Sequence, residues 1–305
     1  MILFLARRVL ISLPVLLVIA TITFFLLFLV PGGPFDREKK LPPEIEANIN
    51  AKYHLDLPVW KQYLFYMSGL ASGDLGPSYK YPGRSVNEIL HDTFPVSMKL
   101  GLASFFVAIS AGLAFGILAA SFHGRWVDRA AMLLSSGGLS LPGFVLGSGL
   151  IFLFSIKLRL LPPALWEGWR YMVLPSLTLG LGAAAYIARL VRSSLLDISF
   201  HEFVRTARAK GLPESRVLLK HMLRNSISPV LTVSGPLLAG LVTGSFVVEY
   251  LFSIPGMGRY FITAVTNRDY PLIMGVTLVY AVVIVAANII VDGLYAVVDP
   301  RVARR

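Results

Sequence analysis

Cysteine is absent from this chain of 305 residues, and charged residues are scarce. Without cysteine, neither disulfide bonds nor thiolate metal ligands are available. Charged residues make up 15% of the chain, whereas they make up about a quarter of an average soluble domain. Hydrophobic residues make up 55%, and the mean hydropathy is +0.70. This composition excludes a disordered chain, a coiled coil and an ordinary cytosolic enzyme, and it predicts an all-α integral membrane protein.

Several catalytic and metal-binding patterns are also missing. The dipeptide Gly-Lys, on which a phosphate-binding P-loop depends, occurs nowhere. Ser148 lies between two glycines but lacks the spacing of a G-x-S-x-G nucleophile elbow. The histidines form no H-E-x-x-H motif and show no other ligand spacing: His54, His91, His123, His201 and His221. We therefore expect this chain to be no enzyme by itself, with no catalytic residue, metal or cofactor.

Six stretches without Asp, Glu, Lys or Arg are long enough, or nearly so, to cross a bilayer as helices, which takes roughly 20 apolar residues. They are Val9–Phe35, Leu100–Phe122, Ala130–Ile156, Tyr171–Ala188, Asn225–Val248 and Pro271–Val291. Their irregular spacing argues against a β-barrel. The first stretch is too long for a signal peptide and precedes no A-x-A-like cleavage site, so we expect it to be retained. The sequence predicts six transmembrane helices.

The distribution of basic residues predicts the orientation, and it accounts for most of the net charge of +11. If the N-terminus is inside, fifteen Lys and Arg residues lie on the cytoplasmic side and five lie in the two short outer loops. Basic residues concentrate in cytoplasmic loops, and long translocated segments such as Asp36–Pro95 count little. We therefore expect both termini to be cytoplasmic.

Two segments are too long to be simple connections. The outer one begins with a helix stop at Pro31-Gly32-Gly33-Pro34 and then predicts short amphipathic helices around Glu44–Lys52 and Pro58–Leu70. It is either a solvated cap or a docking surface for an extracytoplasmic partner. The sequence alone leaves both interpretations open.

The cytoplasmic segment 193–228 predicts a short basic helix, a glycine turn and a second basic helix. Gly211 lies where a helix end needs a left-handed residue, and Pro213 and Glu214 suit the first turn of a helix running to Arg224. The segment either binds anionic lipid or fills a groove on a partner protein.

This segment resembles the signature loop of ATP-binding-cassette (ABC) importer permeases, E-A-A-x-x-x-G, with Arg205-Thr206-Ala207 and Gly211 in the matching positions. The departure from E-A-A, and Leu223-Arg224 in place of Leu-Pro, are similar to the peptide/nickel branch. Other motifs that resemble this branch extend over the whole chain: Ala6-Arg7-Arg8, Pro31-Gly32-x-Pro34, Gly73-Asp74-Leu75-Gly76, Ile254-Pro255-Gly256-Met257-Gly258, Arg268-Asp269-Tyr270 and Asp292-x-Leu294-Tyr295-Ala296-Val297-Val298-Asp299-Pro300-Arg301.

The resemblance implies a type I ABC importer permease (MetI-like) fold in the bacterial cytoplasmic (inner) membrane. It implies four kinds of partner: a homologous second permease, two cytoplasmic ATPase subunits that bind ATP and Mg, an extracytoplasmic peptide-binding protein, and lipid. Lys52-Tyr53-His54-Leu55 and Gly76-Pro77-Ser78-Tyr79-Lys80-Tyr81 are most similar to the B subunit of oligopeptide permeases. Dipeptides, nickel and cell-wall peptides remain open as substrates.

The expected organisation follows from these motifs. Residues 1–30 form a peripheral transmembrane helix, 31–95 an extracytoplasmic cap, 96–298 the permease core with its coupling loop at 193–228, and 299–305 a cytoplasmic tail. The resemblance assigns ATPase docking to part of the loop, with three residues bracing it: Arg205, Thr206, Ala207 and Gly211, then His221, Arg224 and Asn225.

A candidate outer gate follows the fifth span, at Glu249, Pro255, Gly256 and Gly258. The family pattern has an acidic residue at the position of Glu249, which either pairs structurally with the following turn or lines the gate. Candidate pore-lining hydroxyls are Ser135, Ser140, Thr232, Ser234, Thr243 and Ser245. Hydroxyls in spans also bond to their own backbone, so this set has two interpretations.

Small residues recur every four positions in the second span at Ala108, Gly112, Gly116 and Ala120, and in the fifth at Gly240 and Gly244. Such stripes let helices approach closely, within this subunit or across a permease interface. The alternative from a different class is a stand-alone secondary transporter, for which we expect carboxylates near mid-bilayer. None of the six stretches contains Asp or Glu.

Overall fold

The computed structural model describes residues 2–35, 51 and 53–298, and over these residues the fold is helical. The described residues contain no β-strand and a single antiparallel bridge, Pro77–Ser85. Five described helices or helix pairs are long and apolar enough to cross a membrane. The predicted all-α membrane class is confirmed, whereas the count of six spans and the orientation remain predictions.

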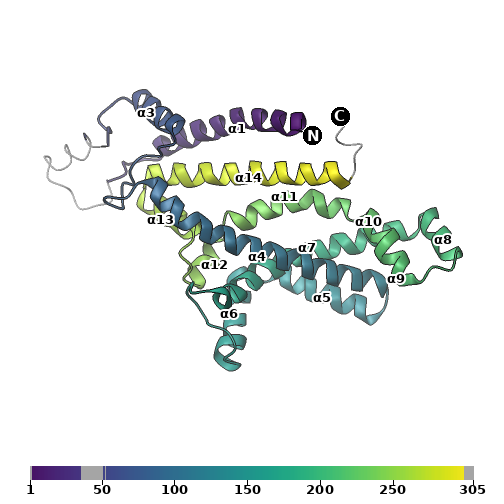
Figure 1. The fold of residues 1–305 in the computed structure, drawn as a ribbon. Coiled ribbons are helices and arrows are strands. Elements are labelled where there is room, and N and C mark those ends of the chain that lie inside the picture. Colours follow the sequence, from purple (N-terminus) through teal and green to yellow (C-terminus); the bar gives the residue numbers. More distant parts are fainter. Residues whose placement is uncertain (1, 36–50, 52, 299–305) are drawn as a thin grey trace.

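Helix α1 (Ile2–Leu29) lies along α14 (Tyr270–Val298) at one edge of the bundle (Figure 1). It ends just before Pro31, as the helix stop predicts, and Gly32 has a φ of 88°. Most of its large apolar side chains are exposed. In a bilayer, such a surface faces lipid.

The segment that is predicted to lie outside contains α3 (Val59–Ser72), which confirms the second expected amphipathic helix. The first, around Glu44–Lys52, lies outside the described residues except for position 51. Helix α4 (Val86–Ser121) then begins fourteen residues before the expected span. Its start is a capping box, in which Ser85 and Glu88 each bind the other's backbone N–H. The charged residues before Leu100 mark where the apolar part of α4 begins. They do not mark where the helix begins.

The third expected span is not one continuous helix. Helix α5 (Trp126–Ser140) ends at the extended pair Leu141–Pro142, and α6 (Gly143–Leu150) continues into the π-helix η1 (Ile151–Lys157). Proline removes a backbone donor and disfavours helical geometry in the residue before it, so the chain breaks there. After the break, α6 projects to one side of the bundle (Figure 1).

Helix α7 (Trp169–Ser199) leads into the segment that is predicted to be cytoplasmic. That segment consists of α8 (Glu202–Ala209), α9 (Glu214–Arg216), the π-helix η2 (Val217–Met222) and α10 (Leu223–Ser226). The predicted helix, glycine turn and second helix are confirmed. Figure 1 shows α8 and α9 beyond the end of the bundle at which α1 begins and α14 ends.

The fifth expected span is divided between α11 (Ser228–Val242) and the short α12 (Phe246–Leu251). Gly244 turns the chain between them with a φ of 89°. Together the two helices are long and apolar enough to cross a membrane. Helix α13 (Met257–Asn267) follows at the end of the bundle opposite α8.

Helix α4 packs most extensively on α7, and the small residues of α4 are the reason. A Cβ at Gly112 would lie 2.6 Å from the Cβ of Ile187, and one at Gly116 would lie 2.8 Å from the carbonyl oxygen of Ala188. The α4 stripe therefore serves packing within this chain. Gly240 and Gly244 form no such stripe within this chain: Gly240 faces open space, and Gly244 accommodates a side chain of α12. Packing of this pair across a permease interface stays a prediction.

Candidate functional site

The candidate coupling loop has a small core of its own. Val204 and Ala207 of α8 are buried in one cluster with Leu195 of α7 and with Val217 and Met222 of η2. These contacts fix α8 relative to the membrane-spanning α7. Ala207, predicted to dock the ATPase, thus faces inward, where its small side chain lets α8 approach η2.

Gly211 makes the turn between the two helices of the loop. Its φ is 76°, in the left-handed region that favours glycine, as predicted. Across the turn the Arg208 guanidinium donates to both carboxylate oxygens of Glu214, at 3.1 and 2.6 Å. These hydrogen bonds hold the pKa of Glu214 below its ordinary value. Both side chains are largely exposed, so the pair orients the turn and contributes less than about 1 kcal/mol to stability.

The exposed side of the loop carries the remaining candidate docking residues. Arg205, Thr206 and Gly211 are exposed on or beside α8. They are accompanied by two exposed aromatic side chains, Phe200 (73% exposed) and Phe203 (41% exposed). Phe200 was not among the predicted docking residues. Its place directly after the apolar α7 gave no periodic signal that it would face outward.

The three predicted bracing residues lie where η2 passes into α10. The Asn225 side-chain amide donates to the His221 carbonyl at 2.7 Å, which ties the end of the π-helix to α10. Arg224 and Asn225 are exposed. The side chains that pack on α8 from this segment are instead Val217 and Met222, whose apolar periodicity is the signal that identifies them.

A second charged cluster at the same end of the bundle was missed by sequence reasoning. The Arg192 guanidinium of α7 donates to both oxygens of Asp128 at the start of α5, at 2.7 and 2.8 Å. It also lies 3.1 Å from the Nδ1 atom of His123. Asp128 is buried, and the hydrogen bonds from Arg192 hold the pKa of Asp128 well below its usual range. The cluster fastens the connection between α4 and α5 to α7.

At the opposite end of the bundle, Glu249 of α12 is fully buried. Ser97 donates its hydroxyl to Glu249 Oε1 at 2.8 Å, and the backbone N–H of Arg259 donates to Oε2 at 2.9 Å. The Ser97 hydroxyl also accepts from the Met257 N–H at 2.8 Å. This geometry favours the structural interpretation of Glu249, because the carboxylate ties α4 to the start of α13. A role of Glu249 in lining the gate stays a prediction.

Three glycines make room for the Glu249 carboxylate. A Cβ would lie 2.4 Å from it at Gly244, 2.5 Å at Gly256 and 3.1 Å at Gly258. Gly256 and Gly258 belong to the candidate gate, together with Pro255, which precedes them in the same turn. The glycines of this motif therefore enclose a buried acid, which the sequence pattern did not reveal.

Asp269 plays a similar part for the outer segment. It is fully buried, accepts the Ser78 hydroxyl, and accepts backbone N–H groups of Tyr79 at 3.0 Å and Lys80 at 3.3 Å. The turn before α14 is thereby tied to the strand-like stretch before α4. The motif Arg268-Asp269-Tyr270 by itself predicts no role for Asp269.

The candidate pore-lining hydroxyls mostly satisfy their own helices. Thr232, Ser234 and Thr243 donate to backbone carbonyls three or four residues earlier, and Ser245 caps α12 by accepting from the Val248 N–H. Ser135 is buried without a partner among the described residues. The side chain of Ser140 lies outside the described part of the chain. Their role as pore lining stays a prediction.

Known proteins resemble this chain over nearly its whole length. Residues 112–304 match the binding-protein-dependent transport system inner membrane components, and residues 1–101 match the N-terminal model for such membrane components. The dipeptide transport system permease protein DppB of Bacillus subtilis (strain 168) is 44% identical to this chain, and the match covers 94% of this chain and 93% of the DppB chain. The oligopeptide transport system permease protein OppB of Escherichia coli (strain K12) is 43% identical over 98% of both chains.

Solved structures show the same fold. A chain of the methionine ABC transporter MetNI, in an inward-facing conformation, superposes with a TM-score of 0.57, covering 69% of this chain and 96% of that chain at 18% identity. The predicted MetI-like core is thereby confirmed as a fold. Family match and full-length relatives together establish that this chain belongs to the inner membrane components of binding-protein-dependent transport systems, the membrane permease components of ABC transporters.

Proposed function

We propose that this chain forms, with a second permease, the translocation path of an ATP-driven importer for oligopeptides. A binding protein outside the membrane delivers the peptide, and two cytoplasmic ATPase subunits supply the energy. Peptide transport is supported by the relatives, which are named as dipeptide and oligopeptide permeases. The choice of oligopeptides over dipeptides rests on the two motifs at 52–55 and 76–81.

The coupling loop is the observation that carries the proposal. It projects past the end of the bundle (Figure 1), and it is fixed to α7 through Val204 and Ala207. A segment fixed in this way moves together with α7 when a partner displaces it. The loop therefore has the construction that is needed to transmit the closure of an ATPase to the membrane helices.

The exposed surface of the loop favours a protein partner over lipid. Phe200 and Phe203 are exposed beside Arg205, and aromatic residues with arginine are typical of the centre of a protein interface. The positive charge of Arg208 is already paired with Glu214, which lessens the attraction to an anionic membrane surface. We therefore assign docking to Phe200, Phe203, Arg205 and Thr206.

A mild-detergent purification of the tagged chain, followed by mass spectrometry and reconstitution, tests the proposal. We expect two ATPases and a second permease to copurify, and ATP-dependent uptake of a labelled oligopeptide once the binding protein is added. Preferred uptake of a dipeptide or of nickel would replace the substrate assignment only. Recovery of this chain alone, where a control complex survives, would contradict the importer assignment.

Arg205→Glu tests the docking surface directly. We expect it to lower the recovery of ATPase subunits and the transport rate, because it reverses a charge at the proposed interface. Arg129→Glu is the matched control, since Arg129 is an exposed arginine at the same end of the bundle but outside the loop. Equal effects of the two variants would contradict the assignment.

For the other end of the bundle we propose that the turn 254–258 belongs to the outer gate, with Glu249 as its structural support. The hydrogen bonds of Glu249 reach α4 and the start of α13, so any movement of this turn has to move those helices as well. Cross-linking of a cysteine pair across the turn, in the ATP-bound and ATP-free complex, tests whether it moves during transport.

A further inference from the structure

Helix α3 packs on α1 through two tyrosines. The Tyr63 ring lies 5.4 Å from the Phe24 ring and 5.3 Å from the Phe25 ring, and its hydroxyl is 2.9 Å from the Thr21 hydroxyl. Tyr66 stacks on Phe24 at 5.7 Å. These contacts define the inner face of α3 and place the helix at the end of the bundle opposite α8 (Figure 1).

Beside this inner face, α3 carries an apolar strip that is exposed at Trp60, Leu64 and Ala71 and half-buried at Met67. Its members are spaced as one face of a helix requires: Trp60, Leu64, Met67 and Ala71. Trp60 is 58% exposed and Leu64 is 55% exposed. The side of α3 beyond the strip carries Lys61, Ser68 and Ser72. It also carries Phe65, which is 55% exposed and stacks on the His54 ring at 5.2 Å.

The strip continues a surface that already faces lipid. The end of α1 next to α3 exposes Phe25, Leu26 and Leu29, the last at 75%. These residues belong to a helix long and apolar enough to cross the membrane. Since Tyr63 of α3 contacts Phe25, the apolar strip lies directly beside this lipid-facing end.

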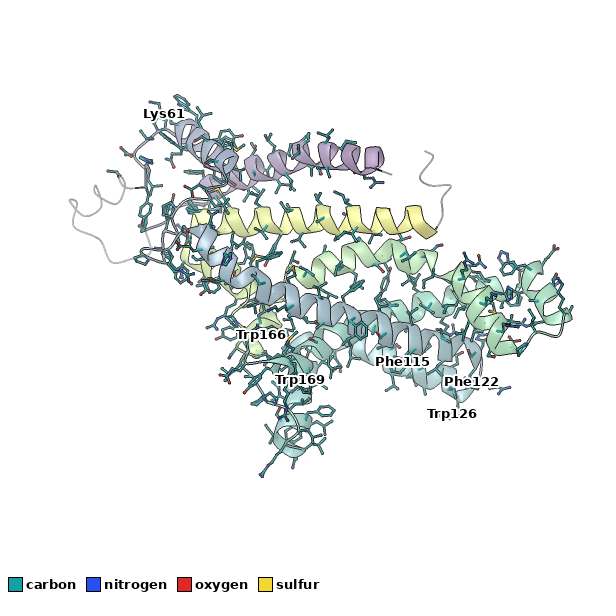
Figure 2. The ribbon with its side chains drawn as sticks, viewed as in Figure 1. Lys61, Phe115, Phe122, Trp126, Trp166 and Trp169 are labelled. Atoms are coloured by element: carbon teal, nitrogen blue, oxygen red, sulfur yellow. The ribbon has the colours of Figure 1, made fainter. Side chains whose placement is uncertain are left out.

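The composition of α3 is that of an interfacial helix. Lys61 is its one charged residue, and the Lys61 ammonium lies 5.5 Å from the centre of the Trp60 ring. Figure 2 shows Lys61 at the outer edge of α3. Tryptophan and lysine are typical of the membrane–water boundary, where the ring lies at the headgroup level and the ammonium reaches water.

We propose that α3 lies in the membrane–water interface at the end of the bundle opposite α8, with Trp60, Leu64, Met67 and Ala71 in the lipid. The partner of this strip is the bilayer surface. Continuity with the exposed apolar end of α1 favours lipid over a protein partner, because a protein seated on the strip would also have to cover the lipid-facing side of α1. Helix α3 thereby anchors the outer segment, holding it at a fixed depth.

The absence of cysteine makes this proposal directly testable. Leu64→Cys, on the strip, and Ser68→Cys, on the polar side, each introduce a unique site for a nitroxide spin label. Both positions are exposed, and they lie one turn apart on the same helix. The full chain, with whatever subunits copurify, is reconstituted into liposomes. The accessibility of each label to oxygen, which partitions into lipid, is compared with its accessibility to a water-soluble nickel chelate.

We expect the ratio of oxygen to nickel-chelate accessibility to be several-fold higher at position 64 than at position 68. Met67→Cys, also on the strip, should repeat the result for position 64 and exclude a local effect of one label. Equal ratios with high nickel accessibility at both positions would overturn the proposal, because the strip would then face water. Exclusion of both reagents from position 64 would also overturn it, because another protein would then cover the strip.

Discussion

Two carboxylates, Glu249 and Asp269, are fully buried at one end of the bundle, and each binds backbone N–H groups of a neighbouring turn. A buried carboxylate without partners would cost several kcal/mol, so these hydrogen bonds are required for stability. Both residues flank α13, and both contact segments far away in the sequence. At the scale of the residue, each buried acid is satisfied by donors from another segment, and at Glu249 three glycines make the room for it.

Gly256→Ala tests the glycine set around Glu249. The new Cβ would lie 2.5 Å from the carboxylate, which cannot move without losing its bonds to Ser97 and Arg259, so we expect a loss of about 1 to 3 kcal/mol. Gly240→Ala is the control, because Gly240 lies in helix α11 with open space beside it. Thermal unfolding of the purified protein measures both, and equal melting temperatures would contradict the steric argument.

Asp128→Asn tests the charged cluster at the other end. Loss of the carboxylate leaves the partly buried Arg192 guanidinium without its main acceptor, so we expect a loss of about 2 kcal/mol. Asp197→Asn, an exposed aspartate of α7, should change stability little. Thermal melting of both variants checks this, and equal shifts would show that the ion pair contributes nothing.

The Asp128 cluster also predicts a pH dependence. The pKa of Asp128 is lowered in the folded protein. The contribution of Asp128 to stability is therefore fully present above the ordinary pKa of 3.8 and is lost as the pH falls below it. We expect the difference in melting temperature between the native protein and Asp128→Asn to stay constant above this value and to shrink below it. A difference that vanishes near neutral pH would contradict the lowered pKa.

At the scale of the element, two glycines with different tasks decide how helices meet and turn. Gly116 lets α4 approach the backbone of α7, and Gly211 provides the left-handed turn between α8 and α9. The first task depends on space and the second on backbone conformation. Different substitutions therefore distinguish them.

Gly116→Ala is expected to destabilise the bundle by about 1 to 3 kcal/mol, because its Cβ would lie 2.8 Å from a backbone oxygen that cannot be displaced alone. Gly137→Ala in α5, where a Cβ meets nothing within 4 Å, is the control and should be neutral or slightly stabilising. Unfolding temperatures in detergent give the comparison. A neutral Gly116→Ala would show that α4 and α7 separate easily.

Gly211 can be tested through its conformation. Valine strongly disfavours a positive φ, whereas asparagine tolerates it, so Gly211→Val should impair coupling of ATP hydrolysis to uptake and Gly211→Asn should largely preserve it. The ATPase activity and peptide uptake of the reconstituted complex are the measurements. If both variants transported normally, the turn would not be needed for coupling.

At the scale of the whole molecule, two ends of the bundle are distinct. One carries α8, α9 and the Asp128 cluster, and the other carries α3, α13 and the turns held by Glu249 and Asp269 (Figure 1). Figure 2 shows Trp126 and Phe122 toward the first end. Trp166 lies in the connection that precedes α7, and Trp169 is the first residue of α7. The distribution of basic residues predicts which end is cytoplasmic.

Single cysteines test this topology. With the N-terminus inside, an impermeant maleimide should label Ser72→Cys in sealed right-side-out vesicles and should not label Ser215→Cys until the membrane is opened. Glu167→Cys tests the broken third segment, because it should be labelled like Ser72→Cys if α5, α6 and η1 together cross the bilayer. Labelling of Ser215→Cys in sealed vesicles would reverse the orientation, and protection of Glu167→Cys would reduce the number of spans.

The sequence by itself determined the features that depend on local composition. The scarcity of charge gave the membrane class, and Pro31-Gly32-Gly33-Pro34 gave the end of α1. Gly211 gave the turn of the candidate coupling loop, since only a residue that accepts a positive φ suits it. The ordered motifs gave the family, which the full-length relatives confirm.

Only the tertiary structure decided which distant groups face each other. The sequence showed glycines at positions 112, 116 and 256 but not the side chains opposite them, which come from α7 and α12. It showed Pro142, yet an apolar run on both sides of it predicted one unbroken helix. It showed Glu249 but not that Ser97 would be its hydrogen-bond partner. A buried acid is satisfied by donors that the fold brings close to it, and hydrophobicity and local propensity carry no information about which donors those are.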